Sequence, residues 1–493
     1  MKVLLIYPDH PETFWGFKHA LKFISKKAVD PPLGLVTVAA MLPEHWEKRL
    51  IDMKVTPLKD IDLKWADLVF ISAMSIQRNT AENVIKRCRE FNKKVVAGGP
   101  LFTIDYDQFD DVDYFVLNEA EITLPRFLND LEHGNANRIY ETDEFANMRC
   151  SPIPAWELLD IKKYAAMDIQ YSRGCPFNCE FCNVSQLLGQ RVRTKTETQV
   201  VNELERLYKL GWRSDVFFVD DNFIGNKNKL KKHLLPAIIE WMASRKQPFR
   251  FSTEASINLA DDDELMALMT RAGFNSVFIG IETLDEESLT ECNKIQNKSR
   301  DLVDCVKRIQ RSGLQVKGGF ILGFDNDPPS VFEQLKSFIQ ESGIVTAMVG
   351  LLNAPRGTRL YSRLKEEGRL LKETTGDNTD FSLNFTPVMD NNILLKGYRE
   401  VISGIYSCEA YYKRIRKFIS EFNPMPGGKM RFKLGFVKTV VKTFFILGIV
   451  GRERIHFWKL FFWTIFKHPR LTHIAMTLAV YGLHFRKIFE RYM

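Results

Sequence analysis

This chain of 493 residues lacks the long apolar runs of membrane-spanning proteins and the paired cysteines of disulfide-rich proteins. No uncharged apolar run reaches the roughly 18 residues that a membrane-spanning helix needs, so we expect no transmembrane segment. The first residues form an apolar stretch that is too brief for a signal peptide. The 8 cysteines show no paired framework, which argues against disulfides and favours a reducing cytoplasm.

Acidic residues are almost missing from the C-terminal end. Residues 425–493 contain 13 Lys or Arg but only 2 Asp or Glu, whereas the whole chain contains 69 and 61. The remaining residues are therefore slightly acidic, although the net charge of the chain is +8. Because the positive charge is confined to one end, we expect a local partner there and no nucleic acid bound by the body of the protein.

Residues 1–150 alternate short apolar runs with helical stretches. We predict strands at residues 2–7, 68–73, 94–97 and 114–117, and helices at residues 33–42, 80–91 and from about 123. Such apolar strands are typical of a parallel sheet that is covered on both faces. Ligands bind beyond the carboxyl ends of these strands. No Gly-x-Gly-x-x-Gly follows the first strand, so a dinucleotide site is not indicated.

From residue 168 the alternation resumes with a different rhythm. Six strand–helix units fit into about 190 residues, and their strands end near Ser172, Asp220, Glu254, Glu282, Gly323 and Leu352. Six units predict a partial barrel, short of the eight in a closed one. Thr196 and Gln199 form a capping box that predicts the first helix. Chemistry in such barrels lies at the carboxyl ends of the strands, although helix capping is the alternative for Asp220 and Asp221.

After residue 358 the barrel pattern stops. We predict helices near residues 359–367 and 393–418 and a Pro/Gly linker at residues 423–428. The tail beyond the linker is aromatic and basic. Helices with Lys or Arg on one face and Phe, Trp or Leu on the other can lie in a membrane interface. Residues 429–493 therefore fit two interpretations: they contact a membrane surface, or they form a small helical bundle whose apolar faces pack on one another.

Three cysteines on one short loop are the most specific motif of the chain. Cys175, Cys179 and Cys182 follow the spacing Cys-x3-Cys-x2-Cys. Soft thiolates suit zinc or an iron–sulfur centre. Structural zinc takes four protein ligands, and the nearest histidines, His133 and His233, are far along the chain. We predict a [4Fe–4S] cluster with one iron left open, with zinc or three unrelated buried thiols as alternatives.

This motif, followed by six strand–helix units, resembles the radical S-adenosylmethionine (SAM) superfamily. The N-terminal region, with Pro31-Pro-Leu-Gly34 and Gly98-Gly-Pro100, resembles its cobalamin-binding branch. The tail resembles an uncharacterised domain that occurs in part of this branch, among enzymes similar to hopanoid C-methylases. The resemblance implies an α/β fold with a Rossmann-like cobalamin domain (1–150), a partial (β/α)6 radical SAM core (151–358) and a helical C-terminal domain (359–493), basic and aromatic from about residue 425.

The resemblance also assigns residues to cofactors. It implies that the three cysteines hold the cluster and that Phe181 packs near the adenine of SAM. The polar groups of SAM would be held by Asp220, Asp221, Asn222, Glu254 and Glu282. Cobalamin would lie against the strand ends and the loops of the first sheet, at Tyr7, Pro8, Leu33, Gly34, Ser72, Met74, Gly98, Gly99 and Glu119.

One motif of many cobalamin proteins is absent. Their Asp-x-His-x-x-Gly sequence supplies a histidine to cobalt, but here Asp9 and His10 are adjacent, and His19 has neither the Asp nor the Gly. We therefore expect no histidine ligand. The resembling branch generally binds cobalamin without one.

The resemblance implies that the cofactors perform the chemistry, so we expect no catalytic side chain beyond them. The leading hypothesis is a C-methyltransferase acting on an unactivated carbon of a hydrophobic substrate, such as a hopanoid-like lipid. Methylation of an antibiotic precursor or a protein side chain, a non-methylating cyclisation or rearrangement, and a cobalamin carrier without a cluster are the alternatives. An electron donor such as flavodoxin or ferredoxin is the expected protein partner. The expected location is the cytoplasm, with peripheral contact at the inner face of the membrane.

Overall fold

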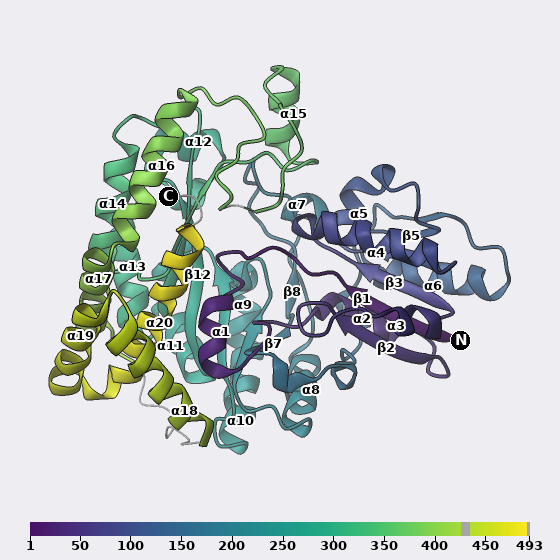
Figure 1. Ribbon diagram of the computed structural model, residues 1–493, viewed down its shortest axis with the longest axis horizontal. Coiled ribbons are helices and arrows are strands. Elements are labelled where there is room, and N and C mark those ends of the chain that lie inside the picture. Colours follow the sequence, from purple (N-terminus) through teal and green to yellow (C-terminus); the bar gives the residue numbers. More distant parts are fainter. Residues whose placement is uncertain (378, 425–433, 491–493) are drawn as a thin grey trace.

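The computed structural model describes residues 1–377, 379–424 and 434–490 (Figure 1). A first parallel sheet lies at one side of the molecule, a second parallel sheet lies in the middle, and a layer of C-terminal helices covers the other side. The predicted α/β class is confirmed. Among the described residues, no helix is long and apolar enough to cross a membrane.

The first sheet has six parallel strands in the order β2-β1-β3-β4-β5-β6. They are β1 (Lys2–Tyr7), β2 (Glu47–Asp52), β3 (Leu68–Ser72), β4 (Lys94–Gly98), β5 (Tyr114–Val116) and β6 (Ile139–Tyr140). Its helices are α2 (Leu33–Met41), α3 (Asp60–Trp65), α4 (Arg78–Glu90), α5 (Pro100–Asp105) and α6 (Ala120–Glu132). Strands with buried residues on both faces account for the parallel arrangement.

Two of these helices begin earlier than the sequence predicts. Helix α4 begins two residues before Thr80, which is not its cap. Helix α6 begins at Ala120 rather than near Thr123, because the Thr123 hydroxyl lies inside the helix and donates a hydrogen bond to the carbonyl of Leu117 at 2.9 Å. A threonine that bonds back to the preceding strand end resembles a cap in the sequence.

The second sheet also has six parallel strands, in the order β14-β13-β12-β11-β10-β7, and this order does not close into a ring. The strands are β7 (Ala166–Ile169), β10 (Asp215–Phe218), β11 (Arg250–Ala255), β12 (Phe274–Glu282), β13 (Gln315–Leu322) and β14 (Ala347–Leu351). The outer helices are α8 (Glu197–Lys209), α10 (Leu235–Ser244), α11 (Asp263–Ala272), α12 (Glu286–Glu291), α13 (Leu302–Arg311) and α14 (Val331–Ser342). The predicted partial barrel is present.

Local chemistry explains where the barrel follows the prediction and where it departs from it. Thr196 and Gln199 form the predicted capping box at the start of α8, with hydrogen bonds of 3.0 and 3.2 Å. The first strand ends three residues before Ser172, because Ser172 and Arg173 form a separate strand, β8 (Ser172–Arg173), which pairs with β9 (Arg193–Thr194) in an antiparallel hairpin. This hairpin flanks the cysteine loop.

The C-terminal helices cover the edge of the barrel. They are α15 (Arg359–Glu366), α16 (Asn391–Tyr406), α17 (Cys408–Glu421), α18 (Leu434–Thr443), the π-helix η10 (Phe444–Val450), α19 (Arg454–Lys467) and α20 (Thr472–Phe489). The hydroxyls of Tyr398 and Tyr406 donate hydrogen bonds to the carbonyls of Val349 and Ala347 on the edge strand β14, at 2.9 and 2.6 Å. The edge strand is thereby protected from other chains.

The helix predicted over residues 393–418 is instead two helices. Ser407 adopts an extended conformation between α16 and α17, and its hydroxyl accepts a hydrogen bond from the amide of Ala410 at 3.3 Å. Serine is a good N-cap, so it starts a new helix rather than continuing the old one. The linker predicted at residues 423–428 lies largely outside the described residues.

The segment after β1 leaves the first sheet and packs against the barrel and the C-terminal helices. The ring of Phe14 stacks on Phe485 of α20 with a centroid distance of 4.2 Å. Trp15 packs edge-on against Phe278 of β12 at 5.4 Å and donates a hydrogen bond to the sulfur of Met348 on β14 at 3.3 Å. Helix α1 (Lys18–Ile24) follows on the same side. The N-terminal region therefore contributes to the barrel core, which the sequence did not indicate.

Candidate functional site

The cysteine loop begins at a position that requires glycine. Gly174 has a φ of +90°, and a Cβ there would lie 2.7 Å from the carbonyl oxygen of Arg191 and 2.9 Å from that of Gly189. The amide of Cys175 donates a hydrogen bond to the carbonyl of Gly189 at 3.2 Å. The loop is thus held tightly against the turn that leads into β9, and a larger residue would separate the two.

Two distant segments hold the other end of the loop. The amide of Glu180 donates to the carbonyl of Cys292 at 2.9 Å, and the side-chain amide of Asn293 donates to the carbonyl of Asn178 at 2.8 Å. Arg359 of α15 donates to that same carbonyl at 2.5 Å. Hydrogen bonds from three parts of the chain therefore hold the loop in place.

An arginine reinforces this anchoring. Arg363 of α15 forms ion pairs with Glu180 at 2.8 Å, with Asp325 at 3.0 Å and with Glu291 at 3.3 Å. Glu180 lies between the second and third cysteines, so its pair with Arg363 restrains the loop directly. Sequence reasoning missed Arg363 because only the fold brings it near the motif. A planar guanidinium that serves several carboxylates is hard to replace by lysine.

The three thiols fit an iron–sulfur cluster. Burial raises the pKa of each thiol, that of Cys182 to about 12, while the nearby ammonium of Lys294 acts to lower all three. Bound iron would keep these sulfurs deprotonated. Among the described residues, no three ligand side chains surround a point where a single ion could be held. A cubane is compatible with the Cys-x3-Cys-x2-Cys spacing, because three of its four irons would each take one thiolate and the fourth would stay open.

A fourth cysteine lies near the motif in space. Cys292 follows α12, and its backbone carbonyl supports the loop as described above. Its side chain is 1% exposed and packs in a cluster with Phe324 and Leu352. The thiol donates weakly to the carbonyl of Leu289 at 3.8 Å. Cys292 therefore acts as a core residue that supports the loop.

Asp220, predicted to bind SAM, forms hydrogen bonds with the neighbouring strand end. Its carboxylate accepts bonds from the amide of Tyr171 at 3.0 Å, from the hydroxyl of Ser172 at 2.5 Å and from the amide of Ser172. Burial raises the pKa of Asp220 to about 7, and the bonds from Ser172 and Tyr171 act in the opposite direction. The capping alternative does not apply, because these donors belong to residues 171 and 172. Asp220 holds the start of the cysteine loop.

The two residues after Asp220 differ in their surroundings. The Asn222 side-chain oxygen accepts hydrogen bonds from the amide and hydroxyl of Ser256, at 3.2 and 3.3 Å, which joins the ends of β10 and β11. The Asp221 carboxylate receives a bond from its own amide, and burial raises its pKa to about 6. Asp221 keeps partial exposure, so it is the residue of this trio that is best placed to meet a ligand.

Glu282 ends strand β12 in an unusual conformation. Its φ is +65°, it lies at a register shift in the sheet, and its carboxylate pairs with Lys294 at 2.7 Å. The Asn297 side chain supports the turn by donating to the carbonyl of Ile281 at 2.9 Å. A Cβ at Gly280 would collide with the Glu282 carboxylate. Glycine, glutamate and lysine therefore form one unit beside the cysteines.

Glu254 lies on β11 one residue before the end of the strand, and so further inside the barrel than the residues that follow the strand ends. In the sheet register it pairs with Phe278 of β12, which in turn pairs with Lys317 of β13. Burial raises the pKa of Glu254 to about 8, with further contributions from the charges of Asp221 and Glu282. Burial lowers the pKa of Lys317. The inner face therefore carries an acid and a base on either side of an aromatic ring.

Phe181, predicted to lie near the adenine, packs beside the same core cluster as Cys292. Its ring meets that of Phe324 in a tilted, edge-on arrangement with a centroid distance of 6.1 Å. This contact fixes the side chain next to the third cysteine. Its role toward adenine stays a prediction.

The positions predicted for cobalamin lie along the carboxyl edge of the first sheet, and two of them require glycine for local reasons. A Cβ at Gly98 would lie 2.7 Å from the carbonyl oxygen of Val116, and Gly99 has a φ of +88° with Ser72 Oγ only 2.6 Å from where a Cβ would be. The tight backbone packing at these two positions is therefore enough to explain why both are glycine. By contrast, nothing lies within 4 Å of a Cβ at Gly34, and Met74 is 51% exposed.

The remaining positions predicted for cobalamin differ in their contacts within the protein. The carbonyl of Pro8 accepts a hydrogen bond from the Gln77 side chain, burial raises the pKa of Tyr7, and Leu33 is the first residue of α2. Glu119 is 4% exposed and pairs with Arg173 at 2.9 Å and with Arg193 at 2.6 Å. Its carboxylate is therefore used to connect the first sheet to the β8–β9 hairpin.

A second bridge connects the two sheets. Arg356, in the loop after β14, pairs with Asp107 at 2.8 Å and with Asp105 at 3.3 Å, both on the first domain. Together with the pairs of Glu119, this bridge holds the carboxyl edge of the first sheet on the side of the barrel that carries the cysteine loop. Figure 1 shows α5 on the same side of the molecule as α7 (Val184–Leu187), the short helix that follows the cysteine loop. The arrangement allows two cofactors to face one another.

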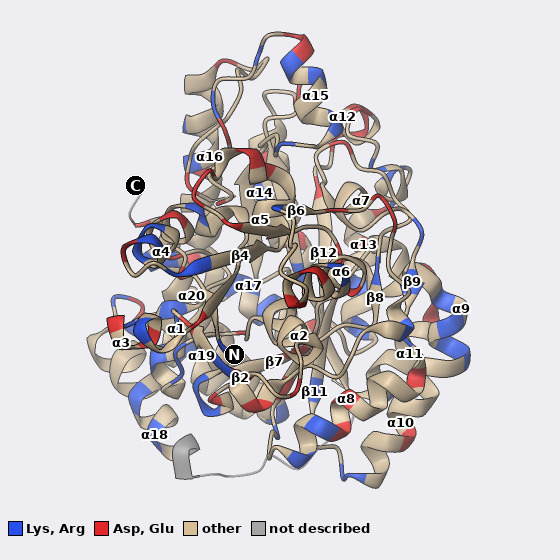
Figure 2. Ribbon diagram, turned by 90° about the vertical axis from the view of Figure 1, so that its right-hand side faces the viewer, with Lys and Arg blue, Asp and Glu red and all other residues tan. Residues whose placement is uncertain are grey.

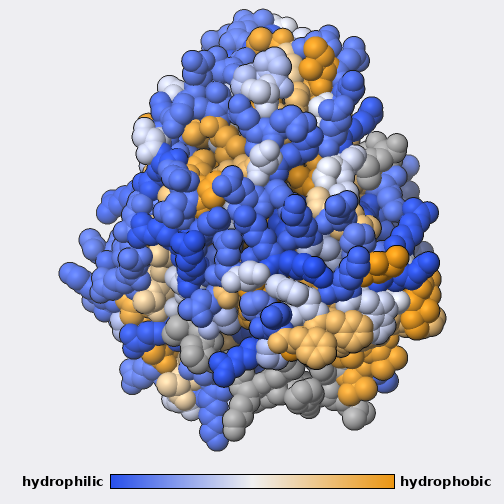
Figure 3. All heavy atoms as spheres, turned by 90° about the vertical axis from the view of Figure 1, so that its left-hand side faces the viewer, coloured by the Kyte–Doolittle hydropathy of each residue, from blue (hydrophilic) through white to orange (hydrophobic). Residues whose placement is uncertain are grey.

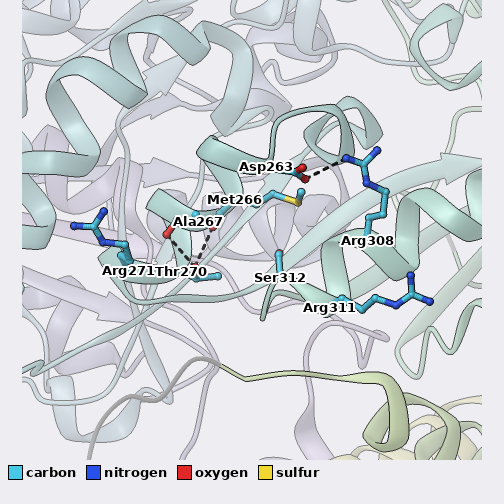
Figure 4. A pocket seen from close by; sticks show the side chains of 8 residues that line it. All are labelled: Asp263, Met266, Ala267, Thr270, Arg271, Arg308, Arg311 and Ser312. Atoms are coloured by element: carbon cyan, nitrogen blue, oxygen red, sulfur yellow. Dashed lines mark hydrogen bonds and ion pairs between the residues drawn. The ribbon is translucent and has the colours of Figure 1, made fainter.

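A surface depression of about 410 Å³ lies elsewhere, between α11 and α13 on the outside of the barrel (Figure 4). Arg308 pairs with Asp263 across it at 3.1 Å, whereas Arg271 and Arg311 point away from each other toward solvent. It contains none of the predicted site residues. The depression is a feature of the helix layer and not of the strand ends.

Three family models match the chain. Residues 26–128 match the B12 binding domain, residues 169–339 match the radical SAM superfamily, and residues 358–493 match a domain of unknown function, DUF4070. Their order agrees with the two sheets and the C-terminal helices. The uncharacterised domain begins where the barrel pattern stops and includes the basic, aromatic end of the sequence.

Relatives and solved structures agree with these matches. An uncharacterised methyltransferase of Synechocystis is 39% identical over 98% of this chain and 91% of its own length. The hopanoid C-2 methylase of Rhodopseudomonas palustris is 32% identical over 93% of this chain and 88% of its own length. The radical SAM methyltransferase TsrM of Kitasatospora setae, solved with cobalamin and a [4Fe–4S] cluster, shares the fold with a TM-score of 0.63 and 14% identity over 97% of this chain and 99% of that one.

The anchored cysteine loop, the facing strand edges and these matches lead to one assignment. The enzyme uses a [4Fe–4S] cluster, SAM and cobalamin, and it acts on a small-molecule substrate. The chain belongs to the radical SAM enzymes that carry a B12-binding domain, and it is a cobalamin-dependent radical SAM methyltransferase.

Proposed function

We propose that this enzyme transfers a methyl group to an unactivated carbon of a hydrophobic substrate, and that the substrate is a hopanoid-like polycyclic lipid. The similarity to a hopanoid C-2 methylase, which extends over 93% of this chain, carries the proposal. That similarity reaches beyond the two cofactor domains into the C-terminal region, where residues that are not needed for the cofactors would serve the substrate.

Each group of residues has a distinct role in this proposal. The cluster and SAM supply radical chemistry, and cobalamin supplies the methyl group. Cys175, Cys179 and Cys182 hold the cluster, while Asp221 and Glu282 orient the polar groups of SAM. We assign the same role to Phe181, Asp220, Asn222 and Glu254, with Asp220 and Asn222 acting through the strand ends that they join.

The positive charge of Lys294 lies beside both the thiols and Glu282. It offsets the negative charge that three thiolates would place in a partly buried site. We assign cobalamin to the first-sheet edge at Tyr7, Pro8, Leu33, Gly34, Ser72, Met74, Gly98, Gly99 and Glu119. Gly34 and Met74 form its open part.

Two partners complete the proposal. A one-electron donor such as flavodoxin or ferredoxin would reduce the cluster, because the radical chemistry starts with one electron passed to it. A lipid substrate would be found in a membrane, so an enzyme that modifies it would need to reach the membrane surface. We therefore place the enzyme in the cytoplasm with residues 429–493 at the inner face of the membrane.

The proposal is tested with anaerobically purified enzyme, a low-potential reductant, SAM with a labelled methyl group, and candidate polycyclic lipids. We expect one lipid to gain a single labelled methyl. Labelled methyl in a peptide or in an antibiotic precursor, with none in the lipids, would replace the lipid proposal. A product of changed structure but without the label would favour cyclisation or rearrangement, and colourless, iron-free protein after anaerobic purification would favour a carrier.

A further inference from the structure

Exposed apolar side chains concentrate on one short part of the C-terminal region. Helices α18, η10 and α19 expose Val437, Val441, Phe445, Ile449, Val450, Ile455, Phe462, Ile465 and Phe466. Ile455 is 62% exposed and Phe466 is 78% exposed. We call these nine residues the apolar face. Figure 3 looks onto that side of the molecule and shows apolar surface at its lower right, with smaller apolar patches higher up.

The residues of the apolar face recur at helical spacing. Val437, Val441, Phe445 and Ile449 are each four residues apart along α18 and η10. Ile455, Phe462 and Phe466 form a second stripe along α19, at intervals of seven and four residues. Opposite these stripes, Leu447, Phe457 and Leu460 are fully buried in the core. The helices therefore pack with one face and leave a second apolar face uncovered by the described residues.

The charges around the apolar face have one sign. From residue 437 to residue 470, every exposed charged side chain is basic: Lys438, Lys442, Arg452, Arg454, Lys459, Lys467 and Arg470. The acidic residue of this stretch, Glu453, is 3% exposed and pairs with Arg486 at 2.8 Å. The N-terminal side of the molecule differs, since Lys, Arg, Asp and Glu are interspersed over it (Figure 2).

We infer that the apolar face of α18, η10 and α19 is a membrane-docking surface that inserts into the interface of an anionic lipid bilayer. An apolar helix face rimmed by lysine and arginine gains both from burying its side chains and from attraction to anionic headgroups. The inference deepens the proposed lipid-modifying function and rests on it for its purpose. It also narrows the membrane contact to particular helices, because α20 is largely buried beneath them.

The charge argues against a second copy of the chain as the occupant. Two copies that met through this face would bring two sets of seven cations together, without the exposed carboxylates that could compensate them. A lipid surface with anionic headgroups complements the same charges. Docking here does not require a spanning helix, in agreement with the helix lengths among the described residues.

The test uses the full chain and flotation with vesicles of phosphatidylcholine alone or mixed with phosphatidylglycerol. We expect the protein to float with the mixed vesicles and to remain largely unbound with phosphatidylcholine. The triple variant Ile455→Ser, Phe462→Ser, Phe466→Ser should weaken binding to mixed vesicles by about tenfold or more, because three apolar side chains no longer enter the interface. Lys459→Glu with Lys467→Glu should weaken it by a similar factor, and the effect should fade in high salt.

Matched controls keep the result specific. Ile61→Ser, Leu371→Ser and Val388→Ser remove exposed apolar side chains elsewhere, and Lys86→Glu with Lys232→Glu reverses exposed charges elsewhere. Both control variants should float like the parent protein, and thermal melts should confirm that all variants fold. Equal loss in the controls would overturn the inference, as would loss of self-association rather than of vesicle binding in the triple variant.

A second readout separates this inference from the proposed function. Methyl transfer to a detergent-solubilised lipid does not need docking, so the triple variant should retain it. If the triple variant still methylates the lipid and also still floats with the mixed vesicles, the docking surface is overturned and the proposed function is retained. If the triple variant loses flotation as expected but the parent protein methylates no lipid, the docking surface is supported and the lipid substrate is rejected.

Discussion

The two sheets share one architecture but present opposite chemistry at their carboxyl edges. Both have six parallel strands. The first edge offers glycine, serine and an exposed methionine, and its predicted carboxylate, Glu119, is paired with two arginines. The second edge offers Asp221, Glu254 and Glu282 near the cysteine loop. An edge of small residues suits a large cofactor that approaches the backbone, and an edge of carboxylates suits a cofactor with an amino group and hydroxyls. In the proposed assignment, the same fold would serve two cofactors through the residues at its strand ends.

We expect the largest effect from substitutions that remove the cluster from the second edge and leave the first edge unchanged. In the triple variant Cys175→Ala, Cys179→Ala, Cys182→Ala, iron content and methyl transfer should fall to background, because the thiolates are the only protein ligands that we assign to iron. Cobalamin bound per chain, measured by its visible absorbance, should stay near the parent value. Loss of both cofactors together would show that the two edges are not independent.

The complementary change blocks the first edge alone. Gly34→Trp places a large side chain where nothing lies within 4 Å of a Cβ, so it should reduce bound cobalamin severalfold and leave iron unchanged. Absorbance and iron analysis of the same sample measure both. Ile61→Trp, at an exposed position away from the strand ends, is the control. If Gly34→Trp binds as much cobalamin as the parent protein, the cobalamin site does not include α2.

A smaller effect concerns the anchoring of the cysteine loop. Arg363→Lys keeps a charge but cannot serve Glu180, Asp325 and Glu291 at once. Residues that orient metal ligands typically change affinity or activity by about 10- to 100-fold, so we expect iron loss to a chelator to be faster by about tenfold. Lys365→Ala, on the same helix and exposed, should leave the rate unchanged. An unchanged rate in Arg363→Lys would assign the anchoring to Gly174 and Asn293.

The smallest effect is on stability and depends on pH. The folded pKa of Glu254 is raised from 4.5 to about 8, so ionising it disfavours the folded state. Its destabilising contribution is absent below about pH 4.5, grows as pH rises and is complete above about pH 8. Glu254→Gln in cofactor-free protein should therefore raise the melting temperature by a few degrees at pH 8.5, and much less at pH 5. An equal rise at both pH values would contradict the assigned cause.

The sequence predicted the barrel strands and four of the six strands of the first sheet, because apolar runs and turn residues are local signals. It missed β2, whose residues are mostly polar, and β6, which has only two residues. The three cysteines were also found, since all lie within eight residues. Arg363, Lys294 and Asn293 were missed because each reaches the loop only through the fold. Asp220 has the sequence position of a ligand but is satisfied by residues 171 and 172, and nothing in its neighbours along the chain indicates that bond.

The C-terminal region shows the same limit. Its aromatic and basic composition predicted contact with a membrane, but composition did not separate the core residues from the exposed ones. Phe457 is fully buried, whereas Phe462, five residues later, is 51% exposed. The helical spacing of both kinds of residue is similar, so packing against α20 and η10 decides which face remains available.

The central claim is that the two edges serve one reaction, with the methyl group passing from the first sheet to a substrate at the second. A single turnover tests it most directly: enzyme loaded with cobalamin that carries an isotopically labelled methyl, given unlabelled SAM and substrate. We predict that the label appears in the first product formed. A methylated product that contains only the unlabelled methyl of SAM would contradict the account.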